Sequence, residues 1–181
     1  MQEEGWGYLT PVDNQSDQGL GMTSMLFLEK VFRILRTGWL AHNHYGTPCT
    51  SFTFAITPPV RSPEFPEGRH GLSERWQEKV AAGSLVAEVA SRCIVISAHA
   101  GTDVTEENPD PCYHWSHPAV AAGVLLVLTF RAIVFYCAFD TPFRKRTRVV
   151  GNNGWVVELA AECCGLPREM HQNPAGQDAH A

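Results

Sequence analysis

The feature that most constrains the fold is one long apolar run from Ala119 to Phe139, whose 21 residues include a single charge, Arg131. As one helix, a run of this length spans a hydrocarbon core of roughly 30 Å. Strongly apolar residues contribute about −0.3 to −0.6 kcal/mol each to insertion, and a central arginine costs about +2.5 to +3.5 kcal/mol. With eleven such apolar residues, the sum favours insertion by about 1–2 kcal/mol. The run therefore predicts a transmembrane helix over residues 119–139, in a mainly α-helical chain with long irregular segments.

The flanks of the run favour the same interpretation. Tyr113 and Trp115 precede it, where an interfacial aromatic belt would lie. The segment RKRTR follows it and contributes four basic residues, Arg144, Lys145, Arg146 and Arg148. Such a cluster indicates a cytoplasmic C-terminal tail, and it attracts anionic lipid by about 1 kcal/mol per basic residue. The expected partner is the lipid bilayer and the expected location a membrane. The orientation has weaker support, because a long N-terminal segment without a signal peptide rarely crosses a membrane.

Two other interpretations of the chain stay open. In the first, the run is the core of a small soluble α+β domain, either as one buried helix or as two strands, GVLLVLTF and AIVFYCAF. Arg131 would then lie at the edge of the core and pair with a carboxylate. In the second, the chain is a lineage-restricted orphan with little stable structure. Its eleven arginines against three lysines suit a GC-rich reading frame as well as a chain selected for packing.

The transmembrane interpretation divides the chain into four regions. Residues 1–22 are a flexible N-terminal segment, and residues 23–118 are a small helical and irregular region. The candidate transmembrane helix occupies residues 119–139. Residues 140–181 form a basic juxtamembrane segment and a C-terminal tail.

Periodicity predicts the elements around the apolar run. Apolar residues at three- and four-residue steps from Met25 to Trp39 predict an amphipathic helix, which Thr23 or Ser24 caps and Gly38 ends. A second helix is predicted over 72–92, short strands over 51–56 and 93–97, and a short helix beginning at residue 155. The polar segment 98–111 is predicted to be a loop.

Few residues suggest chemistry. Cys112, His114 and His117 are zinc-type ligands, and Cys163–Cys164 or His99 would be needed to complete a site, but their spacing matches no ligand motif. His99 and Asp103 follow a predicted strand, where a base and its orienting carboxylate often lie. No nucleotide-binding or serine-nucleophile motif occurs in the sequence.

These observations predict no catalytic, cofactor-binding or metal-binding residues and no cofactor. The net charge of −5 argues against a nucleic-acid partner. We therefore expect a non-catalytic single-pass membrane protein. The alternative is a soluble α+β domain that acts as a binding module, or as a hydrolase-like enzyme around His99 and Asp103.

Overall fold

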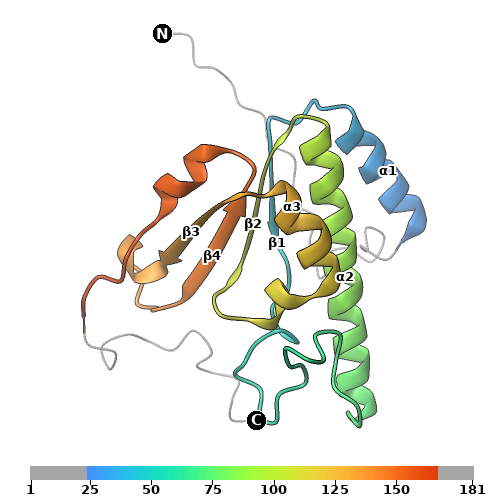
Figure 1. Cartoon of the computed structure of the whole chain (residues 1–181), viewed down its shortest axis with the longest axis vertical. Helices are drawn as coiled ribbons and strands as arrows, with labels where there is room; N and C mark the ends of the chain where they lie inside the picture. Colours follow the sequence, from blue (N-terminus) through green and yellow to red (C-terminus); the bar gives the residue numbers. More distant parts are fainter. Residues whose placement is uncertain (1–23, 167–181) are drawn as a thin grey trace.

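The computed structural model describes residues 24–166, which form an α+β fold around a four-stranded mixed sheet (Figure 1). The strands are β1 (His42–Gly46), β2 (Asp103–Pro109), β3 (Phe130–Phe135) and β4 (Arg146–Gly151), in the order β1-β2-β4-β3. β1 and β2 are parallel, and the other two pairs are antiparallel. The prediction of a mainly α-helical chain is therefore wrong, and the α+β alternative fits the structure. The predictions for residues 1–22 and for the end of the tail lie outside the described residues.

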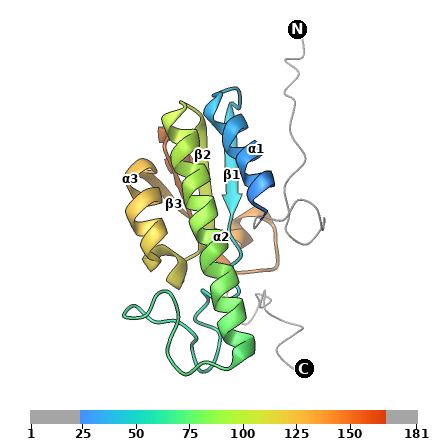
Figure 2. The same ribbon diagram turned by 90° about the vertical axis from the view of Figure 1, so that its right-hand side faces the viewer.

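The helices cover one face of the sheet. α2 (Glu74–His99) connects the two parallel strands and lies between α1 (Met25–Arg36) and the short α3 (Leu125–Val127), as Figure 2 shows. A main core forms between α2 and the sheet and includes Phe52, Ile94 and Val104. The opposite face carries a second, smaller core in which Val156 of the 3-10 helix η4 (Gly154–Leu159) packs against Ala132 and Val134. Both faces of the sheet are thus partly covered by the chain itself.

The amphipathic helix predicted near the N-terminus is confirmed. Ser24 accepts a hydrogen bond from the Phe27 amide, and Gly38 follows the helix with φ +66°, where glycine is unstrained. Leu28 and Leu35 are buried against Val89 and Cys93 of α2. The apolar stripe is shorter than expected, because Met25 and Trp39 are exposed.

The helix predicted over 72–92 continues to His99, so the strand predicted over 93–97 is wrong. Four apolar residues in five cannot distinguish a buried helix from a buried strand. The strand predicted over 51–56 is also wrong, because this segment is a turn. The polar segments that hold β1 and β2 were missed as strands. β2 alternates between the helical layer and the opposite face, which places the charged neighbours Glu106 and Glu107 on different sides of the sheet.

The transmembrane helix predicted over 119–139 is wrong, because this run is divided among several elements. It contains one π-helical turn (η2, Val120–Val124), α3, strand β3 and the 3-10 helix η3 (Tyr136–Phe139). The helical part ends at Leu128, where φ −97° and ψ 88° leave the helical region. β3 then pairs along its whole length with β4. Arg131 is exposed and forms no ion pair with another described residue.

Within residues 24–166, α2 is the one helix that is long and apolar enough to span a bilayer by length and composition. In this structure it packs against β1, β2 and α1, and its buried residues include Ala87, Ala90 and Ile94. Length and composition alone do not separate such a core helix from a membrane span.

Candidate functional site

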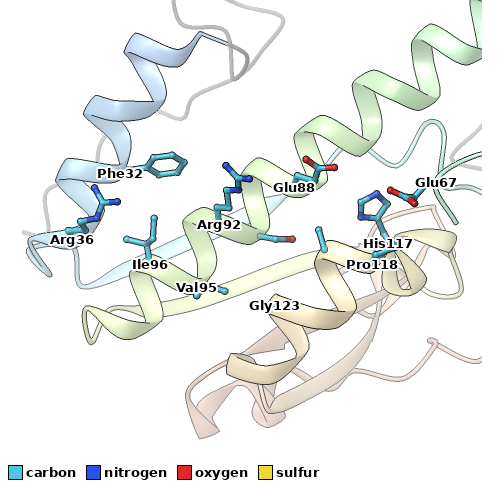
Figure 3. A pocket seen from close by; sticks show the side chains of 12 residues that line it. Phe32, Arg36, Glu67, Glu88, Arg92, Val95, Ile96, His117, Pro118 and Gly123 are labelled. Carbon is cyan, nitrogen blue, oxygen red and sulfur yellow. The ribbon is translucent and has the colours of Figure 1, made fainter.

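A pocket of about 610 Å³ lies between α1, α2 and the segment that begins at His117 (Figure 3). Phe32 from α1 and Val95 and Ile96 from α2 give it an apolar lining. Ala119 and Gly123, at the start of the long apolar run, line the other side. A pocket of this volume, with apolar walls and a few polar groups, is typical of small-molecule sites.

His117 is the most unusual residue of the pocket. Its side chain is 1% exposed, and neither ring nitrogen has a hydrogen-bond partner among the described residues. Burial, aided by the nearby Arg61 and His114, lowers the pKa of His117 to about 4. At neutral pH the ring is therefore uncharged and offers one N–H donor and one acceptor nitrogen. A buried group with two unmet hydrogen bonds requires an explanation, and a bound polar ligand supplies one.

Ser91 of α2 contributes a second unmet polar group to the same pocket. It is buried, and its Oγ has no hydrogen-bond partner within residues 24–166. A helical serine usually bonds the carbonyl one turn earlier or points to water. Ser91 and His117 therefore place one hydroxyl and one neutral imidazole in the wall of the same pocket.

Charges of both signs line the pocket. Arg36 and Arg92 are cations, and Glu67 and Glu88 are anions. In Figure 3, Glu67 lies beside His117, whereas Arg36 lies at the end formed by α1. No carboxylate in the described part of the chain forms an ion pair with either arginine. The pocket is thus lined by charges of both signs that form no ion pair with one another, although Glu88 and Arg92 lie one turn apart on α2.

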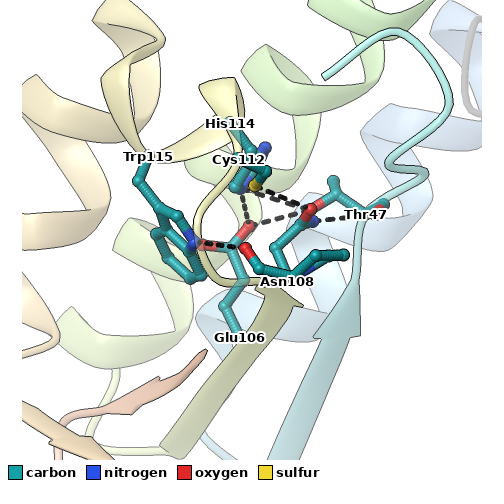
Figure 4. A network of polar contacts seen from close by, with 7 residues as sticks. Thr47, Glu106, Asn108, Cys112, His114 and Trp115 are labelled. Atoms are coloured by element: carbon teal, nitrogen blue, oxygen red, sulfur yellow. Dashed lines mark hydrogen bonds and ion pairs between the residues drawn. The ribbon is translucent and has the colours of Figure 1, made fainter. Parts of the chain in front are cut away.

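The turn that presents His117 is held by a buried polar network on the helical face of the sheet (Figure 4). His114 Nε2 lies 2.9 Å from Glu106 Oε1, and both side chains are fully buried. Thr47 donates to the same Glu106 oxygen at 3.0 Å and accepts from Asn108 Nδ2 at 3.1 Å. Cys112 Sγ donates to Asn108 Oδ1 at 3.4 Å. The network therefore joins β2 to the 3-10 helix η1 (Tyr113–Ser116), directly before His117.

This network is structural in character. Glu106, Asn108 and His114 are each 0% exposed and do not line the pocket, so a substrate there does not contact them. Burial raises the pKa of the Cys112 thiol to about 12, which keeps it protonated and unreactive.

Arg61 does not line the pocket but is linked to His117 through the Phe52 ring. It is buried and forms no ion pair with a carboxylate in residues 24–166, and burial lowers its pKa to about 10 although Glu67 opposes that change. Its guanidinium donates to the carbonyl oxygens of Ser51 and Val80 at 3.1 and 2.8 Å. It also lies 4.0 Å from the centre of the Phe52 ring. Phe52 in turn contacts the rings of His114 and His117 edge to face. Arg61 was not predictable as a buried residue, because the prolines around it in the sequence are typical of a loop.

The structure separates the residues that the sequence singled out. Cys112 binds Asn108, His114 binds Glu106, and His117 faces the pocket, so the three form no common ligand cluster. Cys163 and Cys164 lie instead with Cys137. His99 is exposed at the end of α2.

Asp103 and the basic cluster have other partners. The Asp103 carboxylate accepts from Asn153 Nδ2 at 3.1 and 3.2 Å, and no hydrogen bond joins Asp103 to His99 in the described chain. Arg146 and Arg148 both pair with Asp110, and Lys145 lies 3.9 Å from Glu107. The sequence singled out His117 only as a possible zinc ligand, and Ser91 and the four charged residues of the pocket carried no motif.

Comparison of the chain with models of known protein families, with curated proteins and with solved structures found no match.

Proposed function

We propose that this protein is a binding module that takes a small zwitterionic molecule, of the amino-acid or short-peptide class, in the pocket beside His117. The observation that carries the proposal is a buried neutral histidine without a hydrogen-bond partner within residues 24–166, in a pocket lined by both cations and anions. The expectation of a single-pass membrane protein depended on a helix over 119–139, which is absent. The proposal builds instead on the binding-module alternative.

The charges favour a ligand with both signs. The exposed guanidinium groups of Arg36 and Arg92 suit a carboxylate, which arginine can bind through two parallel hydrogen bonds. Glu67 and Glu88 suit an ammonium group. A purely anionic ligand would meet repulsion from the glutamates, and a purely cationic one would meet repulsion from the arginines.

The remaining groups suit the body of such a molecule. Phe32, Val95 and Ile96 provide apolar contact for a side chain. The Ser91 hydroxyl and the His117 ring nitrogens are buried in the pocket wall with unmet hydrogen-bonding capacity. They can pair with an amide or another polar atom of the ligand once a local movement of the wall brings that atom to them. An unpaired buried polar group destabilises the unliganded protein by about 1–3 kcal/mol. A ligand that pairs with the group removes this cost, which favours binding.

The test is an NMR titration of the full chain with free leucine, free phenylalanine and the dipeptide leucyl-phenylalanine. Each ligand is compared with its N-acetylated and C-amidated derivatives. We expect saturable shifts of the amides around Ser91 and His117, and at least tenfold weaker binding when either charged end of the ligand is blocked.

A matched pair of arginine variants separates pocket binding from general charge. Arg92→Ala removes a pocket cation, whereas Arg75→Ala removes an exposed arginine of the same helix outside the pocket. We expect Arg92→Ala to weaken binding at least tenfold and Arg75→Ala to leave it unchanged. Saturable binding by none of the ligands, or equal loss in both variants, would contradict the proposal.

A further inference from the structure

We propose that Cys137, Cys163 and Cys164 bind one zinc ion through three thiolates, with water in the fourth position. This site lies apart from the His117 pocket and does not depend on the proposed ligand. Within residues 24–166, it is the one group of three or more histidine, cysteine or acidic side chains whose ligand atoms all lie close together.

The sulfur geometry suits one metal ion. The three Sγ atoms lie within 4.8 Å of one another, and Cys137 Sγ is 3.5 Å from Cys163 Sγ. Zinc binds thiolate at about 2.3 Å, so two sulfurs of a tetrahedral site lie about 3.8 Å apart. Movements of less than an ångström therefore bring all three sulfurs to coordination distance. A disulfide would require about 2.05 Å between two sulfurs, so the present spacing is closer to that of a metal site.

The fold itself brings these sulfurs together from distant parts of the chain. Val134 of β3 forms a parallel bridge with Ala161. The bridge is held by hydrogen bonds from the Phe135 amide to the Ala161 carbonyl (2.9 Å) and from the Ala161 amide to the Ile133 carbonyl (3.1 Å). The chain after β3 then leads into η3, which holds Cys137, and the chain after Ala161 leads directly to Cys163 and Cys164. The cluster is therefore set by backbone pairing.

Burial and access suit a site of three protein ligands. Cys137 is buried, Cys163 is half-buried and Cys164 is exposed. The exposed side of the cluster leaves room for a water ligand, as in zinc sites with three protein ligands. Zinc binds the thiolate form of cysteine, so each of the three side chains would lose its proton on binding. Binding would release their protons to solvent.

The charge of the surroundings favours a divalent ion. Three thiolates around Zn²⁺ leave one net negative charge, and the Arg144 guanidinium lies close enough to Cys163 to hydrogen-bond it. A monovalent ion such as Cu⁺ would leave two negative charges beside one arginine. Thiolates bind zinc and copper(I) in preference to magnesium or calcium.

The test uses the full chain, reduced and freed of metal by a chelator. Co²⁺ is added as a spectroscopic substitute, followed by Zn²⁺. We expect uptake of one Co²⁺ per chain with thiolate-to-cobalt charge-transfer absorption, its displacement by Zn²⁺, and one bound zinc in native mass spectrometry. Cys163→Ser and Cys164→Ser should each weaken binding at least tenfold. Cys49→Ser, at another half-buried cysteine, should not change it.

Three results would overturn the proposal. One is the absence of stoichiometric metal uptake by the reduced protein. Another is equal affinity in the Cys163→Ser, Cys164→Ser double variant. The third is a Cys137–Cys163 disulfide that forms in air as fast with zinc present as without it. Circular dichroism of each serine variant confirms that lost binding is not lost folding, and both substitutions lie in the irregular segment after Ala161.

Discussion

His117 combines burial, neutrality and unmet hydrogen bonds, and these properties make its protonation costly to the folded state. Its pKa of about 4 in the folded chain lies below the unfolded value of about 6.5. The unfolded chain therefore binds more protons between these values. The stability that neutral His117 contributes is fully present above about pH 6.5 and is lost as the pH falls towards 4.

We expect the free energy of unfolding to fall by about 2 kcal/mol between pH 6.5 and 4 on account of His117. Urea unfolding across this range measures the change. The variant His117→Gln keeps a polar side chain without titration, so its stability should fall less steeply over the same range. Identical slopes in the two proteins would show that His117 is not the group responsible.

Glu106 is a buried residue of another kind, because its Oε1 atom has two partners, although Oε2 has none within residues 24–166. Glu106→Ala removes the acceptor shared by His114 and Thr47. We expect it to lower the free energy of unfolding by about 3–5 kcal/mol, because partners of a buried pair are left alone. Glu106→Gln, which retains an acceptor oxygen, should lose less.

The neighbouring residue provides a control for that prediction. Glu107 points to the other face of the sheet and is paired only loosely, with Lys145. We expect Glu107→Ala to cost less than about 1 kcal/mol. Chemical denaturation measures the free energy of unfolding of the three variants. An equal decrease for Glu106→Ala and Glu107→Ala would contradict the described network.

At the residue scale, the sequence indicated the histidines but not their partners. The segment that contains Cys112, His114 and His117 is rich in chemically versatile side chains, and that is visible in the sequence. Glu106 and Asn108 lie in a segment that reads as a polar loop. Their burial depends on β2 having the helical layer on one side, which no local pattern records.

At the element scale, α2 carries a glycine in its middle, where helix propensity disfavours one. Gly83 is the point at which the loop of Ser51 and Arg61 approaches the helix. A Cβ on Gly83 would overlap Ser51 Oγ and lie 3.3 Å from Arg61 Nη2. The glycine is therefore required by the packing of the loop that supports the His117 pocket.

We expect Gly83→Ala to destabilise the protein by about 1–3 kcal/mol through overpacking, although propensity alone would stabilise the helix by about 1 kcal/mol. The control is Ala82→Gly at the adjacent exposed position, which should cost about 1 kcal/mol. Thermal and urea unfolding measure both. An increase in stability from Gly83→Ala would show that the loop does not pack as described.

Elements with a clear helical period were predictable, and those without one were not. α1 shows its period and its cap in the sequence, and the structure confirms both. In contrast, the segment 93–97 is apolar on nearly every side, so a helix and a strand fit equally well. β1 and β2 are rich in polar residues, and in β2 several of them, including Glu106 and Asn108, are buried. Polar segments of this kind are typical of loops, so the sequence predicted neither strand.

At the scale of the whole molecule, the prediction for the apolar run 119–139 was wrong. Composition and length indicate that its residues are buried, but not whether lipid or the rest of the protein buries them. Part of the run is buried by α2 and part by β4 and η4. The flanking basic cluster also has an explanation within the fold, because Arg146 and Arg148 pair with Asp110. The soluble alternative was right in its fold class. It offered either one buried helix or two strands over the run, whereas the structure combines a helical first half with strand β3.

The central claim is that the run 119–139 is a helix followed by a strand of the sheet, and the most direct test is NMR of the isotope-labelled full chain in detergent-free buffer. We expect cross-strand nuclear Overhauser effects between Ala132 and Val149 and between Val134 and Thr147, with helical contacts that stop at Leu128. Unbroken helical contacts from Ala119 to Phe139, or a chain that stays in solution only with detergent, would contradict the fold and the pocket that depends on it.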